Sequence, residues 1–546
     1  MEARDQADPP VDDLVEKLLS NTGDYSAIGR SGYNRLLDLL DEMLAEEGTP
    51  LFETFIVEGE LGDYPGELLD YFRPTAAPEW VDPAKLKVAG KLWHQNKLAV
   101  IAALYCISLP SCYLLKNGIP ALYESDKLTD RTHIYQRIYE TGRFLDAVMT
   151  PGGLIMDPRV VAARPARPHD PQGQPKSSEE PTSPAASENP QPGRTIWGPG
   201  FVSARKVRFL HASMRYLLTH RDGVRGGGGA SALTAGSSPN EPPWDTEKLG
   251  KPINQEDLAY TLLTFGYLIP LGLDRWGCRW TLDQREAFLH LWKTVGYTMG
   301  IQEALLTDKL DEAEQLFSRI RDQQAASSTE GELLADALMD FLKDYLPEKL
   351  GINRQVPPLL IKKQIGERYS SMIFTEDREK AACRLRTRVI FFLGLMLIRG
   401  YYAVRNRLFY RVPGAAKLLG NVFAEAGEEL INSWRGAYVR RAFYVPENAQ
   451  TWRRRTGSSS QEFLARIRRW RQKVFNTLVV GVGLLMVLPL VLVAFAVMLV
   501  LGLPVIALIL GSIAVVNFGT AIFLLTHILP ALSKSRPTPM ESISAG

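Results

Sequence analysis

The stretch RKVRFLHASMRYLL, Arg205 to Leu218, places one histidine in a helical pattern of apolar and basic residues. At 100° per residue, one stripe of this helix is apolar and consists of Val207, Leu210, Met214, Leu217 and Leu218. His211 lies between that stripe and Arg208 and Arg215. Such a histidine is either a structural imidazole whose nitrogens are satisfied locally, or an axial ligand of a haem iron. In the second case the two arginines would neutralise the haem propionates.

A second group of residues that could do chemistry occurs in THIYQRIYETGRF. Offsets of three and four residues bring side chains together on a helix, so His133, Arg137, Glu140 and Thr141 share one face. The face is either a solvated polar surface or a site that orients oxygen and handles protons above an iron. A further alternative is a metal site without a porphyrin, built on His133 and Glu140.

The elements that must position these residues are helices, because apolar residues recur at three and four along most of the chain and clean alternating strands are hard to find. The sequence predicts an all-α fold without internal repeats. The expected helices are Val11–Leu19, Tyr33–Glu46, Asp130–Met149, Ser203–Leu218, Asn254–Gly266, Leu282–Met299, Leu310–Arg321 and Glu332–Tyr345.

The end of the chain has a different composition, since no Asp, Glu, Lys or Arg occurs between Lys473 and Lys534. A membrane span needs about 20 apolar residues, so we expect two spans near Phe475–Leu501 and Pro504–Ile528, joined by a tight turn. One long buried soluble helix is the alternative. Both flanks of the segment are basic, and the positive-inside rule then places the main body in the cytosol.

Two other apolar runs need an interpretation. The run Leu98–Leu115 is interrupted by Pro110 and two cysteines, so we expect a buried helix pair and no membrane span. The run Arg388–Tyr410 has basic ends and is either a core helix or a helix that lies on a membrane surface.

Composition excludes several classes of protein. The 546 residues include 63 Lys and Arg against 61 Asp and Glu, so the near-neutral balance gives no argument for a nucleic-acid partner. The four cysteines have neither disulfide nor zinc-finger spacing, and the acidic start MEARDQADPP does not resemble a secretory signal. Residues 163–190 are rich in Pro, Ser and Glu, and residues 221–243 contain the run Gly226–Gly229, so we expect both segments to be disordered.

Four segments together resemble a known family. They are the Arg-x-x-x-Thr helix at Arg137–Thr141, the stretch VRFLHASMR around His211, INQEDLAYTLLTFG at Ile253–Gly266, and HLWKTVGYTMGI at His290–Ile301. In the same order they look like the catalytic domain of the rubber oxygenases (latex-clearing proteins), a family that includes the endoplasmic-reticulum-bound oxygenases of mycophenolic acid biosynthesis. The resemblance covers roughly Lys85 to Asp308.

The resemblance implies a globin-reminiscent helical core that holds haem b. By this resemblance His211 is the proximal iron ligand, and Arg137 and Thr141 shape the oxygen pocket. Members of the family cleave carbon-carbon double bonds of isoprenoid chains with dioxygen and give carbonyl products. Rubber-cleaving members have a lysine directly before the distal threonine, whereas this chain has Glu140, which puts polymer cleavage in doubt. Glu124 is the nearest upstream acid that could serve as a base.

These observations predict a membrane-anchored, haem b-dependent oxygenase for a lipophilic isoprenoid or olefinic substrate, in the endoplasmic reticulum. A non-catalytic membrane-anchored interaction protein and a non-haem metal enzyme are the alternatives. Five regions are expected: a helical N-terminal region 1–84, a catalytic core 85–350 with inserts near 163–198 and 221–247, a basic membrane-proximal region 351–473, a transmembrane hairpin 474–533 and a cytosolic tail 534–546.

Overall fold

The computed structural model describes residues 3–20, 25, 28–45, 64–73, 76–126, 131–156, 196–220, 244–345, 352–408, 414–434 and 461–537. The two segments predicted to be disordered, 163–190 and 221–243, lie outside these residues. The last residues of each predicted insert are described. Residues 196–198 contain the strand β2, and residues 244–247 contain the start of the helix α12.

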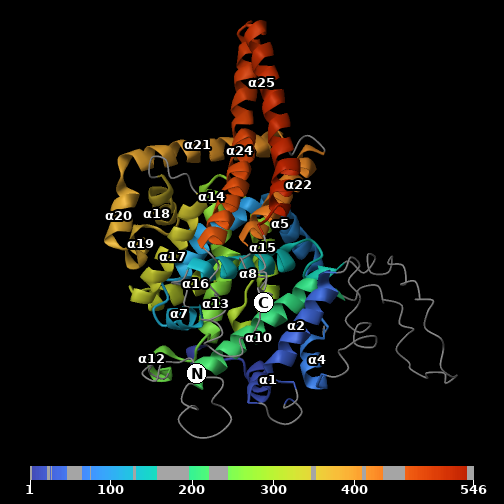
Figure 1. Cartoon of the computed structure of the whole chain (residues 1–546), viewed down its shortest axis with the longest axis vertical. Helices are drawn as coiled ribbons and strands as arrows, with labels where there is room; N and C mark the ends of the chain where they lie inside the picture. The colour runs from blue at the N-terminus through green and yellow to red at the C-terminus, as the bar shows by residue number, and fades with distance from the viewer. Residues whose placement is uncertain are drawn as a thin grey trace, which may run out of the picture.

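The fold is all-α, as predicted, and helices make up the body shown in Figure 1. The described residues contain only two strands, of two residues each, β1 (Ile155–Met156) and β2 (Ile196–Trp197), which pair antiparallel. The N-terminal helices are η1 (Ala3–Asp5), α1 (Pro9–Leu19), α2 (Gly29–Ala45) and α4 (Gly66–Phe72). The core begins with α5 (Pro83–Ala103), the π-helical turn η4 (Leu104–Ser108), α6 (Leu109–Cys112), α7 (Ile119–Asp126) and α8 (Arg131–Met149).

The second half of the core is also helical. It contains α10 (Pro199–Thr219), α12 (Thr246–Leu249), α13 (Gln255–Leu263), the π-helical turn η6 (Thr264–Leu268), α14 (Ile269–Arg275), α15 (Leu282–Thr298), η7 (Glu303–Leu305), α16 (Leu310–Gln324) and α17 (Thr329–Tyr345). All eight helices predicted from periodicity are present, with ends shifted by a few residues. The run Leu98–Leu115 is buried, as predicted, and a π-helical turn joins its two α-helical parts.

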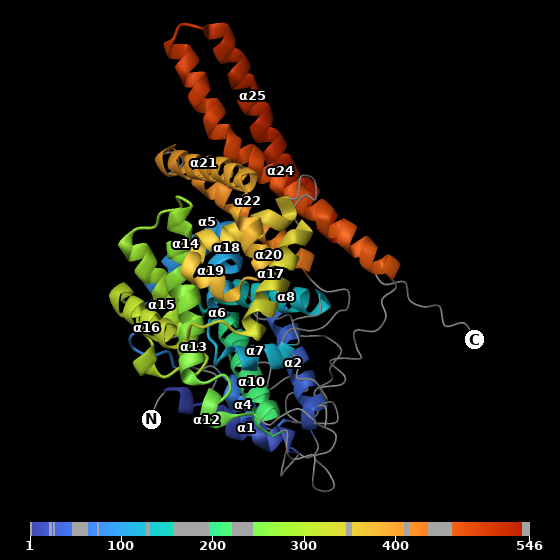
Figure 2. The same ribbon diagram turned by 90° about the vertical axis from the view of Figure 1, so that its left-hand side faces the viewer.

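Five further helices follow the core, namely α18 (Ile352–Ile365), α19 (Glu367–Ile373), α20 (Glu376–Cys383), α21 (Leu385–Leu408) and α22 (Ala415–Trp434). Two long helices follow, α24 (Gln461–Val500) and α25 (Pro504–Phe523), and the second continues through η10 (Leu524–Ile528) and α26 (Leu529–Lys534). They form the predicted hairpin, which projects from the body in both views (Figures 1 and 2). Its turn is at Gly502, whose φ of 71° is easily adopted by glycine.

Both hairpin helices are long and apolar enough to cross a membrane. Only 24% and 17% of their most apolar windows are buried within the protein, which is low for core helices of a soluble domain. The helices pack closely where side chains are small or absent. A Cβ at Gly481 would come within 2.7 Å of Leu525, and Asn517 donates a hydrogen bond to the carbonyl of Leu484 (3.2 Å).

Candidate active site

A mostly apolar cavity of about 300 Å³ lies in the helical core, which is at the lower end of the volumes that small-molecule sites usually have. Its walls come from segments far apart in the sequence, namely η4, α6, α7, α8, α10, α13, η6, α15 and α17. Leu, Ile, Val, Phe, Met and Trp side chains form most of the lining. Few polar groups reach it, so each of them is a candidate for chemistry.

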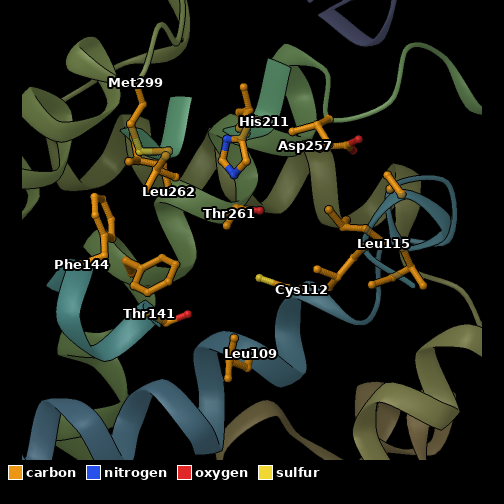
Figure 3. A pocket seen from close by; sticks show the side chains of 18 of the residues that line it. Leu109, Cys112, Leu115, Thr141, Phe144, His211, Asp257, Thr261, Leu262 and Met299 are labelled. Carbon is orange, nitrogen blue, oxygen red and sulfur yellow. The ribbon is translucent and has the colours of Figure 1, made fainter. Parts of the chain in front are cut away.

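His211, Glu140 and Thr141 all line this cavity, so the structure brings together three residues that sequence reasoning singled out. His211 comes from α10, and Glu140 and Thr141 come from α8. In Figure 3 the imidazole of His211 points toward the middle of the cavity, and the hydroxyl of Thr141 and the sulfur of Cys112 also point toward it. The histidine and the threonine therefore face a common space from two different helices.

Two glycine-containing segments, one after α8 and one at the start of α10, hold the helices that carry these residues together. The amide of Gly200 donates to the carbonyl of Gly153 (2.7 Å), and the amide of Gly198 donates to the carbonyl of Leu154 (2.9 Å). A Cβ at Gly200 would lie 2.6 Å from the carbonyl oxygen of Ala147, so only glycine allows this approach. With the β1–β2 pairing, these bonds fix the end of α8 against the start of α10, although residues 157–195 separate them in the chain.

Arg208 and Arg215 were predicted to bind the cofactor beside His211, but neither lines the cavity. Arg208 makes two charge-assisted hydrogen bonds to Asp8 (2.6 and 2.7 Å), and Arg215 binds Asp12 at 2.7 Å. Burial lowers the pKa of Arg208, but the hydrogen bonds to Asp8, the charge of Asp8 and the charges of Tyr71 and Asp12 together raise it more, so its pKa lies above the ordinary value. Both guanidinium groups are engaged by carboxylates at the start of α1, some 200 residues away in the chain, which sequence spacing could not reveal.

Arg215 also donates to the carbonyl of Ile253 (3.1 Å), a residue that lines the cavity. Ile253 has a φ of 51°, in the left-handed region that β-branched residues rarely adopt. Strained backbone of this kind costs about 1–3 kcal/mol and tends to occur at functional sites. Arg215 therefore supports the rim of the cavity through the backbone, without facing the cavity itself.

Two lining residues were not singled out from the sequence, although they lie in the segment INQEDLAYTLLTFG. Asp257 and Thr261 are one turn apart on α13 and both line the cavity. The Asp257 carboxyl accepts from Arg4 (3.0 Å) and from the side chain of Asn254 (2.9 Å), and its oxygens point away from the middle of the cavity in Figure 3. Burial raises the pKa of Asp257 to about 6, although Arg4 opposes this effect. An acid one turn before a threonine on an apolar helix was the signal that could have found them.

The polar groups of the cavity suit a haem better than a bare metal ion. Within the described residues, no three His, Cys, Asp or Glu side chains are grouped so that they could hold a metal ion. Burial raises the pKa of the Cys112 thiol to about 11, so this group is an uncharged thiol at neutral pH when no metal is bound. One imidazole in an apolar wall remains, which is the arrangement that a histidine-ligated haem needs.

Several predicted residues have side chains outside the described part of the structure. These are Arg137 and His133 on α8 and Glu124 on α7. The backbone of α8 is described along its whole length and carries residue 137 one turn before Thr141. The distal role of Arg137, and a metal site that uses His133, stay predictions.

Comparison with known proteins supports the resemblance read from the sequence. Residues 193–395 match the family described as ER-bound oxygenase mpaB/B'/Rubber oxygenase, catalytic domain. This match includes His211 and the two downstream segments. It begins after the Arg137–Thr141 helix, however, and extends beyond Asp308, where the predicted resemblance ended.

One relative is a rubber oxygenase from Streptomyces sp. (strain K30), which is 24% identical over 178 residues. The aligned part covers 32% of this chain and 38% of that relative. A solved structure of latex clearing protein LCP in the closed state aligns with 77% of this chain and 90% of that chain, at 19% identity and a TM-score of 0.48. The family match and the rubber oxygenase relative confirm the resemblance, while the aligned segment spans well under half of the relative's length.

Proposed function

We propose that this protein is a membrane-anchored, haem b-dependent oxygenase. Its residues 193–395 match the mpaB/rubber oxygenase catalytic-domain family. Its substrate would be a lipophilic isoprenoid or another olefin, cleaved or oxidised with dioxygen. The observation that carries the proposal is the meeting of His211, Glu140 and Thr141 in one apolar cavity. The family match covers α10 and not α8, so the position of Glu140 and Thr141 opposite His211 is an observation of the structure.

In this proposal His211 holds the haem iron from α10, and the bound haem supplies the binding and activation of dioxygen. Thr141 faces the same space from α8, so its hydroxyl can donate a hydrogen bond to a polar group in the middle of the cavity. Glu140, next to Thr141 on the same helix, is a lining group that can accept and return a proton. The apolar lining binds a hydrocarbon chain and excludes water, so that the few polar groups act in a low dielectric.

Glu140 stands where rubber-cleaving members have a lysine, so this pocket carries an acid in place of a base. An apolar cavity favours the neutral form of either group, which is the protonated form of a carboxyl group and the deprotonated form of an amine. We therefore propose a small olefinic substrate rather than a polymer. Oxidative cleavage would place one oxygen atom of dioxygen on each carbon of the former double bond, which gives two carbonyl groups.

The membrane part of the proposal depends on the hairpin α24–α25. Its exposed surface is apolar, and basic residues precede α24's apolar part and follow the second helix. By the positive-inside rule the body would lie in the cytosol, and the family points to the endoplasmic reticulum. A lipophilic substrate partitions into the bilayer, so an anchored enzyme works where its substrate is concentrated.

The proposal is tested with full-length protein in detergent, reconstituted with haem and incubated with a short isoprenoid under ¹⁸O₂. We expect carbonyl products that carry ¹⁸O, detected by mass spectrometry, and no such products with heat-inactivated protein. Iron without a haem spectrum would favour the non-haem alternative. The absence of haem, iron and products together would leave the interaction-protein alternative.

A further inference from the structure

Helix α21 presents a row of large apolar side chains to the outside of the protein. Leu385, Val389, Phe392 and Met396 follow one another at offsets of four, three and four residues, so they form a single stripe. Their exposed fractions are 76%, 49%, 56% and 41%, and the adjacent Leu393 is 57% exposed. Monomeric soluble proteins seldom expose so large a contiguous apolar surface.

The opposite face of α21 is fixed to the body, which sets the direction of the stripe. Thr387, Tyr401 and Tyr402 are buried, and Thr387 hydrogen-bonds to Gln355 of α18. Near its C-terminal end, Arg399 donates to the carbonyl of Arg275 at the end of α14 (2.9 Å). The helix is therefore held along its length, and the apolar stripe faces away from the body.

The position of α21 relates this stripe to the hairpin. In both views α21 runs across the base of the hairpin, and it packs against α24 (Figures 1 and 2). The exposed apolar surface of α24 begins at Val479 and Val480 and continues toward the turn. The apolar stripe of α21 and the apolar surface of the hairpin thus lie next to each other at one end of the molecule.

The charges around the stripe limit what can cover it. Arg384, Arg386 and Arg388 are exposed at the start of α21, and Arg468, Arg469 and Lys473 are exposed just before the apolar part of α24. Only residues 389–398 lie between Arg388 and Arg399, which is about 15 Å of helix. That length is half of a hydrocarbon layer of about 30 Å, so α21 is too short between its charges to cross a bilayer.

We propose that α21 lies in the plane of the membrane, with its apolar stripe inserted among the lipids of the leaflet that faces the body. The exposed arginines bind the headgroups of anionic phospholipids at the same level. This inference rests on the membrane anchoring in the proposed function. It adds a second membrane contact that holds the body at a fixed height and orientation over the bilayer.

The experiment uses the full-length protein in vesicles of phosphatidylcholine and phosphatidylserine, with spin labels at single introduced cysteines. The three variants are Phe392→Cys on α21, Val493→Cys on the hairpin and Glu247→Cys on α12. Val493 is exposed on the hairpin, and α12 lies at the opposite end of the molecule in both views. Unsubstituted protein, treated in parallel, corrects for labelling of the natural cysteines. Collisions with oxygen, which dissolves in lipid, are compared with collisions with a water-soluble nickel chelate.

We expect the label at position 392 to collide more with oxygen than with nickel, at a depth between those of the other two labels. A label at 392 as water-exposed as that at 247, with 493 deep in the bilayer, would overturn this inference and leave the anchor in place. Water exposure at both 392 and 493 would overturn the anchor and the inference together. A label at 392 as deep as at 493 would also contradict an in-plane helix.

As a second measurement, Arg386→Glu together with Arg388→Glu removes the proposed headgroup contacts. The label at 392 should then become shallower in vesicles that contain phosphatidylserine. In pure phosphatidylcholine the substitutions should change its depth less. An equal effect in both kinds of vesicle would contradict the binding of anionic headgroups.

Discussion

The two sides of α10 have different roles, since one lines the cavity and the other attaches the helix to the N-terminal helices. Its inner side, with Val207, Leu210, His211 and Met214, lines the cavity. Its outer side is attached to the N-terminal helices by ion pairs of Arg208 and Arg215 with carboxylates of or next to α1, and by the stacking of Phe209 on Tyr33 (4.1 Å). The charged groups next to a candidate ligand thus fix its helix in place and leave the cavity nearly apolar.

Helix α15 repeats this division. Trp292 lines the cavity, whereas His290 on the outer side accepts a hydrogen bond from the amide of Asp82 (2.9 Å) and contacts Asp308 through its other nitrogen (3.0 Å). The partners of His290 therefore lie outside the cavity, which indicates a structural role, whereas His211 faces the cavity. Both residues are histidines, so the side of the helix on which each one lies distinguishes their roles.

The largest effect should come from breaking the outer side of α10 with Arg208→Ala. This change leaves Asp8, which is 5% exposed, as a buried charge without its main partner. We expect a loss of about 3–5 kcal/mol in the free energy of unfolding, measured by denaturation in detergent. The double variant Arg208→Leu with Asp8→Leu should recover much of this loss. A stable Arg208→Ala protein that binds no haem would instead support the role that the sequence predicted for this arginine.

A change on the inner side, Thr141→Val, should act on turnover and not on stability. It removes one hydroxyl and keeps the shape of the side chain, so we expect the free energy of unfolding to change by less than about 1 kcal/mol. Turnover of the olefinic substrate should fall by about 100-fold, because a positioned polar group is lost from the cavity. Equal turnover in both proteins would remove Thr141 from the mechanism.

The smallest effect concerns His290 and pH. Burial lowers the pKa of His290 below 6.5, although its contact with Asp308 opposes this. As pH falls below about 6.5, the unfolded chain binds a proton that the folded chain resists, so stability falls by at most about 1.4 kcal/mol per pH unit. Asp257 acts in the opposite direction, because its pKa is raised to about 6 and the folded state gains its proton first.

The contribution of His290 is therefore measured as a difference between the wild type and His290→Gln. Unfolding of both proteins is followed between pH 7.5 and pH 5.5. The wild type should lose more stability over this range than the variant. Parallel curves would show that His290 does not resist protonation in the folded protein.

The features that depend on local periodicity, namely the helices and their apolar faces, could be predicted from the sequence. The helices that carry His211 and Thr141 have one apolar stripe each, so their boundaries and inward faces could be predicted. The hairpin could also be predicted, because a long apolar segment without charged residues is visible from composition alone. The pairing of His211 with Glu140 and Thr141 in one site came from the family resemblance, since nothing in the spacing brings α8 and α10 together.

Contacts between distant parts of the chain could not be predicted. Arg208 and Arg215 lie next to the apolar stripe on a helical wheel, and only the folded position of Asp8 and Asp12 shows which way they turn. Asp257 was missed because an acid near a helix start is ordinarily a capping group. The sequence left two interpretations of α21, and the exposed apolar stripe seen in the structure is the observation on which the proposed membrane contact rests.

The central claim is that His211 holds a haem in this cavity, and an optical spectrum tests it most directly. Full-length protein and His211→Ala are reconstituted with haem in detergent, beside His220→Ala as the matched control. His220 is an exposed histidine at the end of the same helix. We expect a Soret band that shifts with carbon monoxide in the wild type and in His220→Ala, and its loss in a folded His211→Ala protein. An unchanged band in His211→Ala, or no band in any of the three, would contradict the claim.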